Sequence, residues 1–310
     1  MEGSAPVSLV LAVFLDALSL GPVDLSPLEA HCRLRCWPTT DPHQCLERLQ
    51  GATVAITNKV PLSGELLRQL PDLRLICTAS TGTDQVDGEA CRQLGIGLQN
   101  AGAYSRPSVV QITWSLILAL RGRLEERLQQ WRNGAWAASP VFALVEPEFD
   151  ELEGQTLTVL GAGSIGRGVA AVGEALGMRT LQLTSRSSAA ELEQALREAD
   201  VLSLHAPLTA ATRGLLDRQR LAWLRPSALL VNTARGALVD TDALVEALRA
   251  GRLAGAALDV LPEEPPSIVS LAALQTVPNL IVTPHMAWTS RQARQRLVQT
   301  LADHLAALGG

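Results

Sequence analysis

The sequence has little charge of either sign and no stretch that is rich in lysine or arginine. Only 18% of its 310 residues are charged, and the net charge is -5 at pH 7. An acidic chain without a basic block lacks the electrostatic surface that nucleic-acid-binding proteins need. With 47% hydrophobic residues, the chain is too apolar to be intrinsically disordered. We therefore expect a folded protein with no nucleic-acid partner.

Long hydrophobic runs are also missing. The N-terminal run Val7–Leu15 follows Glu2 rather than basic residues, which is unlike a signal peptide, and we interpret it as a buried strand. The run Val109–Leu120 is interrupted by three polar residues. It is shorter than the roughly 20 apolar residues that a membrane span needs. The sequence therefore predicts a cytoplasmic protein with no membrane association.

The five cysteines form an odd-numbered set, which argues against a disulfide framework. Cys32 and Cys36 are expected to stand one helical turn apart, with His31 and His43 nearby, so a metal site is conceivable. The spacing, however, matches no common zinc motif. We predict that the cysteines are small packing residues in a reducing compartment and that there is no metal site.

Short apolar runs alternate with amphipathic segments of helix length, which favours an α/β fold with mainly parallel sheets. In the first third of the chain the expected strands are Leu9–Leu15, Thr53–Thr57, Leu73–Thr78 and Ile96–Leu98. A second series of strands is expected at Leu157–Leu160, Thr180–Leu183, Val201–Leu204, Leu229–Asn232, Ala256–Asp259 and Leu280–Val282. Helices are expected between members of this series at Ile165–Leu176, Ala189–Arg197 and Thr241–Ala250.

The two series of strands predict two domains. Gly102 and Pro107 interrupt the chain between the series, and Pro284 follows the last expected strand. A final helix at Arg291–Leu308 could return to the first domain. We therefore expect a continuous domain of residues 103–283, inserted into a split domain of residues 1–102 and 284–310.

A glycine-rich turn follows the first strand of the second series. The chain reads Gly161-Ala-Gly163-Ser-Ile-Gly166 between an expected strand and an expected helix, which is the context that a dinucleotide-binding loop requires. Gly161 permits the tight turn, Gly163 removes a side chain that would block the pyrophosphate, and Gly166 lets helix and strand pack closely. The phosphates would meet free N–H groups at the positive end of the helix dipole. Residues 103–283 are thus predicted to be a doubly wound Rossmann domain that binds NAD or NADP.

The next strand bears on the choice of cofactor. An acidic residue about 20 positions on would bind the ribose 2′-hydroxyl of NAD, but no acid occurs between Ala175 and Ala190. The loop instead contains Ser185, Arg186 and Ser187, which could bind a 2′-phosphate. We predict that NADP is preferred. The alternative is that Arg186 only stacks on adenine and that NAD is used equally well.

Three motifs in the second half of the chain carry a resemblance to one enzyme family. They are Asn232-Thr-Ala-Arg235-Gly, Asp259-Val-Leu-Pro-Glu-Glu264-Pro and Thr283-Pro-His285-Met-Ala-Trp288. With the glycine motif, His205-Ala-Pro207 and Thr78-Ala-Ser-Thr-Gly82, they resemble the D-isomer-specific 2-hydroxyacid dehydrogenase family. The chain is most similar to the glycerate dehydrogenase/hydroxypyruvate reductase branch, also through Gly134-Ala-Trp136. The resemblance implies a flavodoxin-like substrate domain and NAD(P)H-dependent reduction of hydroxypyruvate or glyoxylate to the D-2-hydroxy acid, and the reverse.

Reduction of a 2-oxo acid needs a clamp for the carboxylate, polarisation of the ketone and a proton for the new alkoxide. Arg235 follows a strand end and is expected to hold the carboxylate and the ketone oxygen. His285 is expected to be the general acid in reduction and the base in oxidation. Glu264 is expected to bond the far ring nitrogen of His285 and to fix its tautomer. The predicted catalytic residues are therefore Arg235, Glu264 and His285.

The resemblance also implies which residues surround the two ligands. The expected cofactor-binding residues are Gly161, Gly163, Ser164, Ile165, Gly166, Ser185, Arg186, Ser187, Pro207, Thr212, Thr233, Ala234 and Asp259. The expected substrate-binding residues are Ser80, Thr81, Gly82, Arg235, His285 and Trp288, with backbone amides near Ser80–Gly82 receiving the carboxylate. Two alternatives stay open: Asp259 as a carboxylate that only caps a loop, and Trp288 as a core residue.

Two further expectations concern partners. Trp136 lies after an expected long helix, Ser105–Arg121, which helps to build a dimer interface in this family, so a homodimer is expected. Core packing is the alternative for Trp136. An NAD(P)H-sensing binding protein of the corepressor type is the alternative function, because some relatives with this fold act in that way. Dehydrogenation of formate or phosphite fits less well, because formate-using relatives carry an amide where this chain has Glu264.

Overall fold

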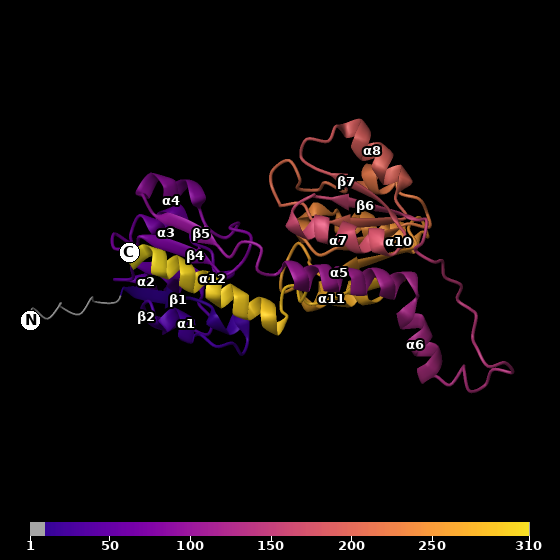
Figure 1. Cartoon of the computed structure of the whole chain (residues 1–310), viewed down its shortest axis with the longest axis horizontal. Helices are drawn as coiled ribbons and strands as arrows, with labels where there is room; N and C mark the ends of the chain where they lie inside the picture. The colour runs from indigo at the N-terminus through magenta and orange to yellow at the C-terminus, as the bar shows by residue number, and fades with distance from the viewer. Residues whose placement is uncertain (1–9, 310) are drawn as a thin grey trace, which may run out of the picture. The chain divides into compact units, whose positions relative to one another are not determined.

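The computed structural model describes residues 10–309, which fall into two compact units. Unit 1 is described over residues 10–105 and 289–309, and unit 2 comprises Arg106–Trp288. Each unit is an α/β structure built on one parallel sheet (Figure 1). Residues 7–9 of the N-terminal apolar run lie outside the described residues, and Leu11–Phe14 of that run form the largely buried strand β1. Among residues 10–309, no helix combines the length and the hydrophobicity needed to cross a bilayer.

Unit 1 contains a five-stranded parallel sheet with the order β2-β1-β3-β4-β5. Its strands are β1 (Leu11–Phe14), β2 (Arg33–Cys36), β3 (Val54–Thr57), β4 (Leu75–Thr78) and β5 (Gly97–Asn100). Its helices are η1 (Ala17–Leu20), α1 (Ser26–Glu29), η2 (Pro42–Gln44), α2 (Cys45–Leu49), α3 (Gly64–Leu67), α4 (Gly88–Leu94) and α12 (Arg291–Gly309). This strand order is the flavodoxin-like one, in which the chain reverses direction across the sheet at β1. The expected fold class is confirmed.

Strand β2 was not expected from the sequence. It lies at the edge of the sheet and its residues are mostly exposed, so it lacks the apolar pattern of the buried strands. The expectation that Cys32 and Cys36 stand one helical turn apart was wrong, because Cys36 ends this extended strand. The Cys32 thiol instead donates a hydrogen bond to the Leu28 carbonyl at 3.3 Å. All five cysteines are free, and no group of three metal-ligating side chains occurs within residues 10–309.

Unit 2 contains a six-stranded parallel sheet with the order β11-β10-β9-β8-β6-β7. Its strands are β6 (Thr156–Leu160), β7 (Arg179–Leu183), β8 (Val201–Leu204), β9 (Leu229–Asn232), β10 (Gly255–Leu258) and β11 (Leu280–Val282). Its helices are α5 (Arg106–Arg121), α6 (Leu124–Arg132), α7 (Ser164–Ala175), α8 (Ala189–Glu198), α9 (Arg218–Leu221), η3 (Gly236–Leu238), α10 (Thr241–Arg249) and α11 (Ile268–Gln275). The strand order reverses at β6, as in a doubly wound Rossmann sheet.

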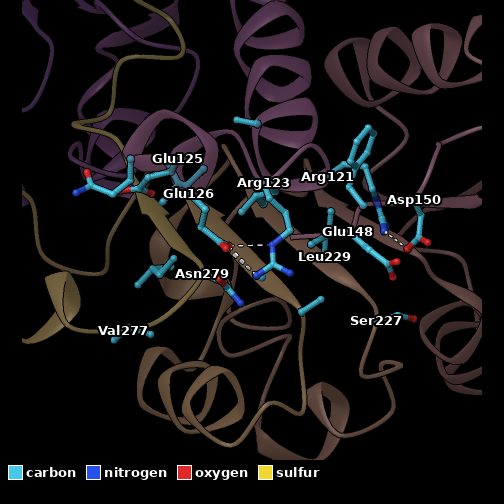
Figure 2. Close-up of a pocket in the computed structure, with 18 of the residues that line it drawn as sticks. Arg121, Arg123, Glu125, Glu126, Glu148, Asp150, Ser227, Leu229, Val277 and Asn279 are labelled. Carbon is cyan, nitrogen blue, oxygen red and sulfur yellow. Dashed lines mark hydrogen bonds and ion pairs between the residues drawn. The ribbon is translucent and has the colours of Figure 1, made fainter. Parts of the chain in front are cut away.

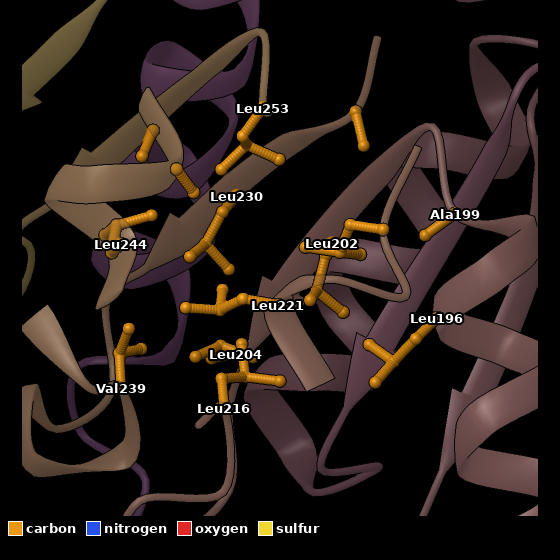
Figure 3. Close-up of a cluster of buried hydrophobic side chains, with 14 of the residues drawn as sticks. Leu196, Ala199, Leu202, Leu204, Leu216, Leu221, Leu230, Val239, Leu244 and Leu253 are labelled. Atoms are coloured by element: carbon orange, nitrogen blue, oxygen red, sulfur yellow. The ribbon is translucent and has the colours of Figure 1, made fainter. Parts of the chain in front are cut away.

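Leucine side chains from strands and helices form the larger core of unit 2. Leu202 and Leu204 of β8 and Leu230 of β9 pack with Leu196 of α8 and Leu244 of α10, and all five are fully buried (Figure 3). Burying one such side chain contributes roughly 1.5–3 kcal/mol. Helices α5 and α7 contact each other and belong to the second cluster of buried side chains in this unit. Buried between helices in this way, the strands present their carboxyl ends at one edge of the sheet.

One segment of unit 2 departs from this layered arrangement. The arm, which we define as residues 124–150, consists of α6 and the segment after it, and it extends away from the sheet (Figure 1). Arg127 donates hydrogen bonds to the carbonyls of Leu144, at 3.1 Å, and Pro147, at 2.6 Å. Trp136 donates from Nε1 to the Phe142 carbonyl at 2.9 Å and is 53% exposed. The alternative that Trp136 packs in the core was therefore wrong.

Candidate functional site

The glycine-rich turn connects β6 to α7 at the carboxyl edge of the sheet of unit 2. Gly161 has a φ of +106°, and a Cβ there would lie 2.5 Å from the His205 carbonyl. A Cβ at Gly166 would lie 2.0 Å from the Gly161 carbonyl oxygen, so neither position admits a side chain. Gly163 is the N-cap of α7, and a Cβ there would meet nothing within 4 Å. The turn thus leaves open space beside a helix N-terminus, which fits the pyrophosphate of a dinucleotide.

The loop after β7 contains the three residues that are expected near the adenosine ribose. It is closed by hydrogen bonds from Ser187 N to the Thr184 carbonyl, at 3.1 Å, and from Thr184 N to Ser187 Oγ, at 3.2 Å. Arg186 is exposed at its tip. The nearest following acid is Glu191, whose carboxylate accepts hydrogen bonds from Ser188 in the capping box of α8. Glu191 is thus already engaged with its own helix.

The segment after β8 contributes further expected cofactor residues. Thr212 donates its hydroxyl hydrogen to the Pro207 carbonyl at 2.6 Å and so closes the loop between them. His205 is hydrogen-bonded through Nε2 to Ser203 Oγ at 2.8 Å. Burial lowers the pKa of His205 to about 4, so this histidine is neutral near pH 7. A neutral histidine whose Nε2 is engaged by Ser203 is poorly suited to act as a second acid.

Arg235 stands just beyond the carboxyl end of β9. The Asn232 side chain holds this turn, because it accepts from Ala234 N at 3.0 Å and donates to the Arg235 carbonyl at 2.9 Å. The half-buried Arg235 guanidinium donates to the Ala234 carbonyl at 2.8 Å. The next residue is Gly236, where a Cβ would lie 2.0 Å from the Leu261 carbonyl carbon. Only glycine allows the Arg235 turn to approach the loop that carries Glu264 this closely.

His285 and Glu264 form an ion-pair-like contact at the same edge of the sheet. His285 Nδ1 lies 2.6 Å from Glu264 Oε2, and the two side chains are 25% and 28% exposed. The other carboxylate oxygen of Glu264 accepts from Leu261 N at 2.9 Å. With Nδ1 held by the carboxylate, Nε2 of His285 is the ring atom that can exchange a proton. The hydrogen bond that was expected from the sequence is therefore present.

Asp259 anchors the backbone around His285. Its carboxylate, 1% exposed, accepts from Thr283 Oγ1 at 2.6 Å, Met286 N at 2.9 Å and Ala287 N at 2.8 Å. The Asp259 carbonyl also accepts from His285 N at 2.8 Å. These bonds hold His285 in a left-handed conformation with a φ of +50°. Asp259 thus fixes the loop, which is one of the two roles considered for it, and its contact with the cofactor stays a prediction.

The remaining expected residues lie in several places. Thr233 shares a buried hydroxyl contact of 2.9 Å with Thr113 of α5, and Trp288 is half-buried. Ser80, Thr81 and Gly82 belong to unit 1 and follow β4. Within residues 10–309 no acceptor is found for the backbone N–H groups of these three residues. They have the open donors that a substrate carboxylate needs.

A pocket of about 770 Å³ lies at the opposite edge of the unit 2 sheet (Figure 2). Its lining includes the first residues of β9, β10 and β11. Polar side chains complete it: Arg121 of α5, Arg123 between α5 and α6, and Glu125, Glu126, Glu148 and Asp150 of the arm. None of the predicted site residues lines it. Neither this pocket nor the supporting roles of Asn232 and Gly236 were predicted from the sequence. For Asn232 and Gly236, the only available signal was their place in the Arg235 motif.

Comparisons with known proteins agree with this geometry. The profile of the family described as "D-isomer specific 2-hydroxyacid dehydrogenase, NAD binding domain" matches residues 114–287. A glycerate dehydrogenase of Methylorubrum extorquens is 40% identical over 271 residues, which cover 87% of this chain and 86% of that protein. A hydroxypyruvate reductase of Blautia hydrogenotrophica is 29% identical over an alignment that covers 94% of this chain and 95% of that protein.

Among solved structures, a D-lactate dehydrogenase from Aquifex aeolicus, complexed with NAD and lactic acid, is 28% identical. It superposes with a TM-score of 0.83 over 96% of this chain and 95% of that one. The family profile covers more than half of this chain and the Methylorubrum relative most of it, and both agree with the motifs and with the parallel sheets. The chain therefore belongs to the D-isomer specific 2-hydroxyacid dehydrogenase family.

Proposed function

We propose that this protein reduces a small 2-oxo acid, such as hydroxypyruvate or glyoxylate, to the D-2-hydroxy acid, and that it catalyses the reverse reaction. The 2.6 Å contact between His285 and Glu264 carries the proposal, because it orients a proton-exchanging histidine at the edge where the glycine-rich turn lies. The relatives named as glycerate dehydrogenase and hydroxypyruvate reductase point to the same substrates. We propose that residues 103–283 bind the cofactor and that residues 1–102 and 284–310 bind the substrate, with boundaries that lie within about five residues of those of units 2 and 1.

The catalytic roles follow from the groups at this edge. The bound nicotinamide cofactor supplies the hydride. Arg235 binds the substrate carboxylate and the ketone oxygen, so that negative charge on that oxygen is stabilised as it develops. His285 gives its Nε2 proton to the oxygen in reduction and takes it back in oxidation. Glu264 keeps the imidazole oriented through Nδ1, and the backbone amides of Ser80–Gly82 receive the carboxylate.

A direct assay tests this function. Purified protein is mixed with NADPH or NADH and with hydroxypyruvate or glyoxylate, and loss of the dihydronicotinamide absorbance is followed. An enzyme of this kind should turn over at about 1 s⁻¹ or faster. The second candidate, an NAD(P)H-sensing protein of the corepressor type, would bind the cofactor tightly without comparable turnover. Cofactor binding with no turnover of any 2-oxo acid would therefore favour the sensor.

For the cofactor, we propose that NADPH is preferred over NADH. Arg186 is exposed beside two serines, and Glu191, the nearest following acid, is engaged in its capping box. Replacing Arg186 by glutamine removes charged hydrogen bonds to the 2′-phosphate, so kcat/KM with NADPH should fall roughly tenfold or more while the value with NADH stays nearly unchanged. Arg197→Gln on α8 is the matched control. A tenfold preference of the wild type for NADH would contradict the proposal.

We also propose that the protein is a homodimer built through the arm and α11. Phe142 is 92% exposed, and Val141, Val145, Ile268 and Val269 are exposed as well. Such apolar surface on an ordered segment is typical of an interface. Sedimentation equilibrium should give twice the 33.0 kDa mass of the chain, and Phe142→Glu should shift the population to monomer. Leu18→Glu, at an exposed site in unit 1, is the control, and a monomeric wild type would contradict the dimer.

For location, we propose the cytoplasm. All five cysteines are free, although four of them are buried among apolar residues. Unpaired thiols in this number are typical of proteins that work in a reducing compartment.

A further inference from the structure

The cationic side chains of this protein are almost all arginines. Of 26 basic residues 25 are arginine, and the single lysine is Lys59. The two side chains are not interchangeable, since lysine offers a compact ammonium with three rotatable donors and arginine a rigid planar fork. Because all the other 25 basic residues are arginine, the choice of lysine at position 59 needs a structural explanation.

Lys59 stands just beyond the carboxyl end of β3, where the strand order of unit 1 reverses between β1 and β3. In open α/β sheets, ligands bind outside the carboxyl ends of the strands at such a reversal. Lys59 is exposed, although its backbone is firmly held. The buried carboxylate of Asp16, at the end of β1, accepts from Asn58 N at 2.9 Å and from Lys59 N at 2.7 Å.

The Asp16 carboxylate binds the backbone of the loop that carries Lys59. Asp16 is only 7% exposed, and its burial raises the pKa of the carboxyl. Hydrogen bonds from the backbone amides of residues 58–60 and the nearby charge of Lys59 oppose that shift. A carboxyl placed in this way holds the loop in one conformation. The backbone of Lys59 is therefore fixed, and its side chain starts from a defined point at the edge of the sheet.

A second contact ties this loop to the expected substrate carboxylate site. Gln85 donates from Nε2 to the Asn58 carbonyl at 2.8 Å and to Ser80 Oγ at 3.3 Å. Ser80 Oγ in turn donates to the Gly82 carbonyl at 2.7 Å. β3 and β4 are neighbours in the sheet, with Thr57 opposite Thr78. Neighbouring strands lie roughly 4.7–4.9 Å apart, so the loops after β3 and β4 begin side by side at the carboxyl edge of the sheet.

We propose that Lys59 binds the polar substituent at C3 of the substrate and so selects 2-oxo acids that carry a 3-hydroxyl group. The carboxylate lies on the amides of Ser80–Gly82 after β4, and the C3 hydroxyl oxygen accepts a hydrogen bond from the Lys59 ammonium after β3. The inference rests on the proposed function and adds which 2-oxo acids the enzyme selects. Lys59 is a specificity determinant and takes no part in hydride or proton transfer.

The first test compares three acids on Lys59→Met, which removes the ammonium group and keeps an unbranched side chain that is one heavy atom shorter. Hydroxypyruvate carries the C3 hydroxyl, pyruvate lacks it, and glyoxylate lacks C3 altogether. One charged hydrogen bond is worth about 1.5–3 kcal/mol, so kcat/KM for hydroxypyruvate should fall about 10- to 100-fold, with pyruvate and glyoxylate changing by less than about threefold. Arg68→Met, which removes an exposed cation elsewhere in unit 1, should change none of the three.

The loss of kcat/KM for each of the three acids tests whether Lys59 binds the C3 hydroxyl group. An equal loss for all three acids would place Lys59 on the shared carboxylate or in the stability of the loop, and would overturn the proposal. Unchanged discrimination between hydroxypyruvate and pyruvate would overturn it too. The thermal unfolding midpoint of Lys59→Met, measured beside the wild type, separates a loss of folding from a loss of contact.

A second readout needs no turnover, and so separates failure of this inference from failure of the proposed function. With NADPH bound, D-glycerate and D-lactate cannot be oxidised, because the cofactor is already reduced. Acetylation of Lys59 by an amine-reactive ester is followed by mass spectrometry of the peptide that contains it. Saturating D-glycerate should slow the reaction about tenfold, since the ammonium is held in a charged hydrogen bond, and D-lactate should not. Equal protection by the two acids, or none, would refute the role of Lys59 even if no acid were reduced.

Discussion

We expect His285→Ala to lower kcat for reduction by roughly 10²–10⁴-fold, the usual contribution of a positioned general acid. The variant keeps Arg235 and the glycine-rich turn, so the substrate and the cofactor still bind, but no side chain delivers a proton to the alkoxide. The measurement is steady-state reduction of hydroxypyruvate at saturating NADPH, together with the dissociation constant of NADPH from fluorescence titration. That constant should stay close to the wild-type value, because none of the glycine-turn contacts involves His285.

The matched control for this experiment is His43→Ala. His43 is a surface histidine of unit 1 whose side chain is 79% exposed beside Asp41. Its removal should leave kcat unchanged. If His285→Ala retained full activity, or if NADPH affinity fell together with kcat, the histidine would have to be assigned a different role.

The second large effect is expected for Arg235→Ala. Two charged hydrogen bonds, to the carboxylate and to the ketone oxygen, are worth about 3–6 kcal/mol together, so kcat/KM should fall by roughly 10²–10⁴-fold. Arg235→Lys should recover only part of this loss, because a single ammonium cannot replace a planar fork. The kinetic measurement is the same, with each variant compared at its own saturating cofactor concentration.

The structure supplies a check on the Arg235 result. Asn232 holds the turn through backbone groups, so removal of the Arg235 side chain should leave the turn in place. The thermal unfolding midpoint should therefore stay near that of the wild type. A kcat/KM within about tenfold of the wild type for Arg235→Ala would rule out the carboxylate clamp.

The buried parts of the fold could be predicted from the sequence. The fully buried strands β8 and β9 have the expected bounds, because short apolar runs between helices leave little choice of structure. The half-buried edge strand β11 also has its expected bounds, since all three of its residues are apolar. Two exposed elements, β2 and α6, were missed. Strand β2 is exposed, and helix α6 has no buried residue, so neither carries the hydrophobic periodicity on which such a prediction depends.

For the candidate site, too, only some features could be predicted from the sequence. The hydrogen bond between Glu264 and His285 could be expected, because the motifs that hold them resemble those of one family. A loop-capping role of Asp259 was one of two alternatives, but that the loop it anchors is the one that carries His285 could not be expected, and neither could the close approach at Gly236. Both depend on which backbone segments meet once the sheet has formed, and spacing along the chain does not contain that information.

The hydrogen bonds within the arm bear on how quickly two chains could assemble. A segment that is ordered only on association gives up roughly 1–2 kcal/mol of backbone entropy for each residue that becomes fixed. Here Arg127 already ties α6 to the carbonyls of Leu144 and Pro147 within the single chain. Most of that entropy is lost during folding, before the chains collide, so association should resemble rigid-body docking, with a rate set by diffusion and orientation rather than by folding of the arm.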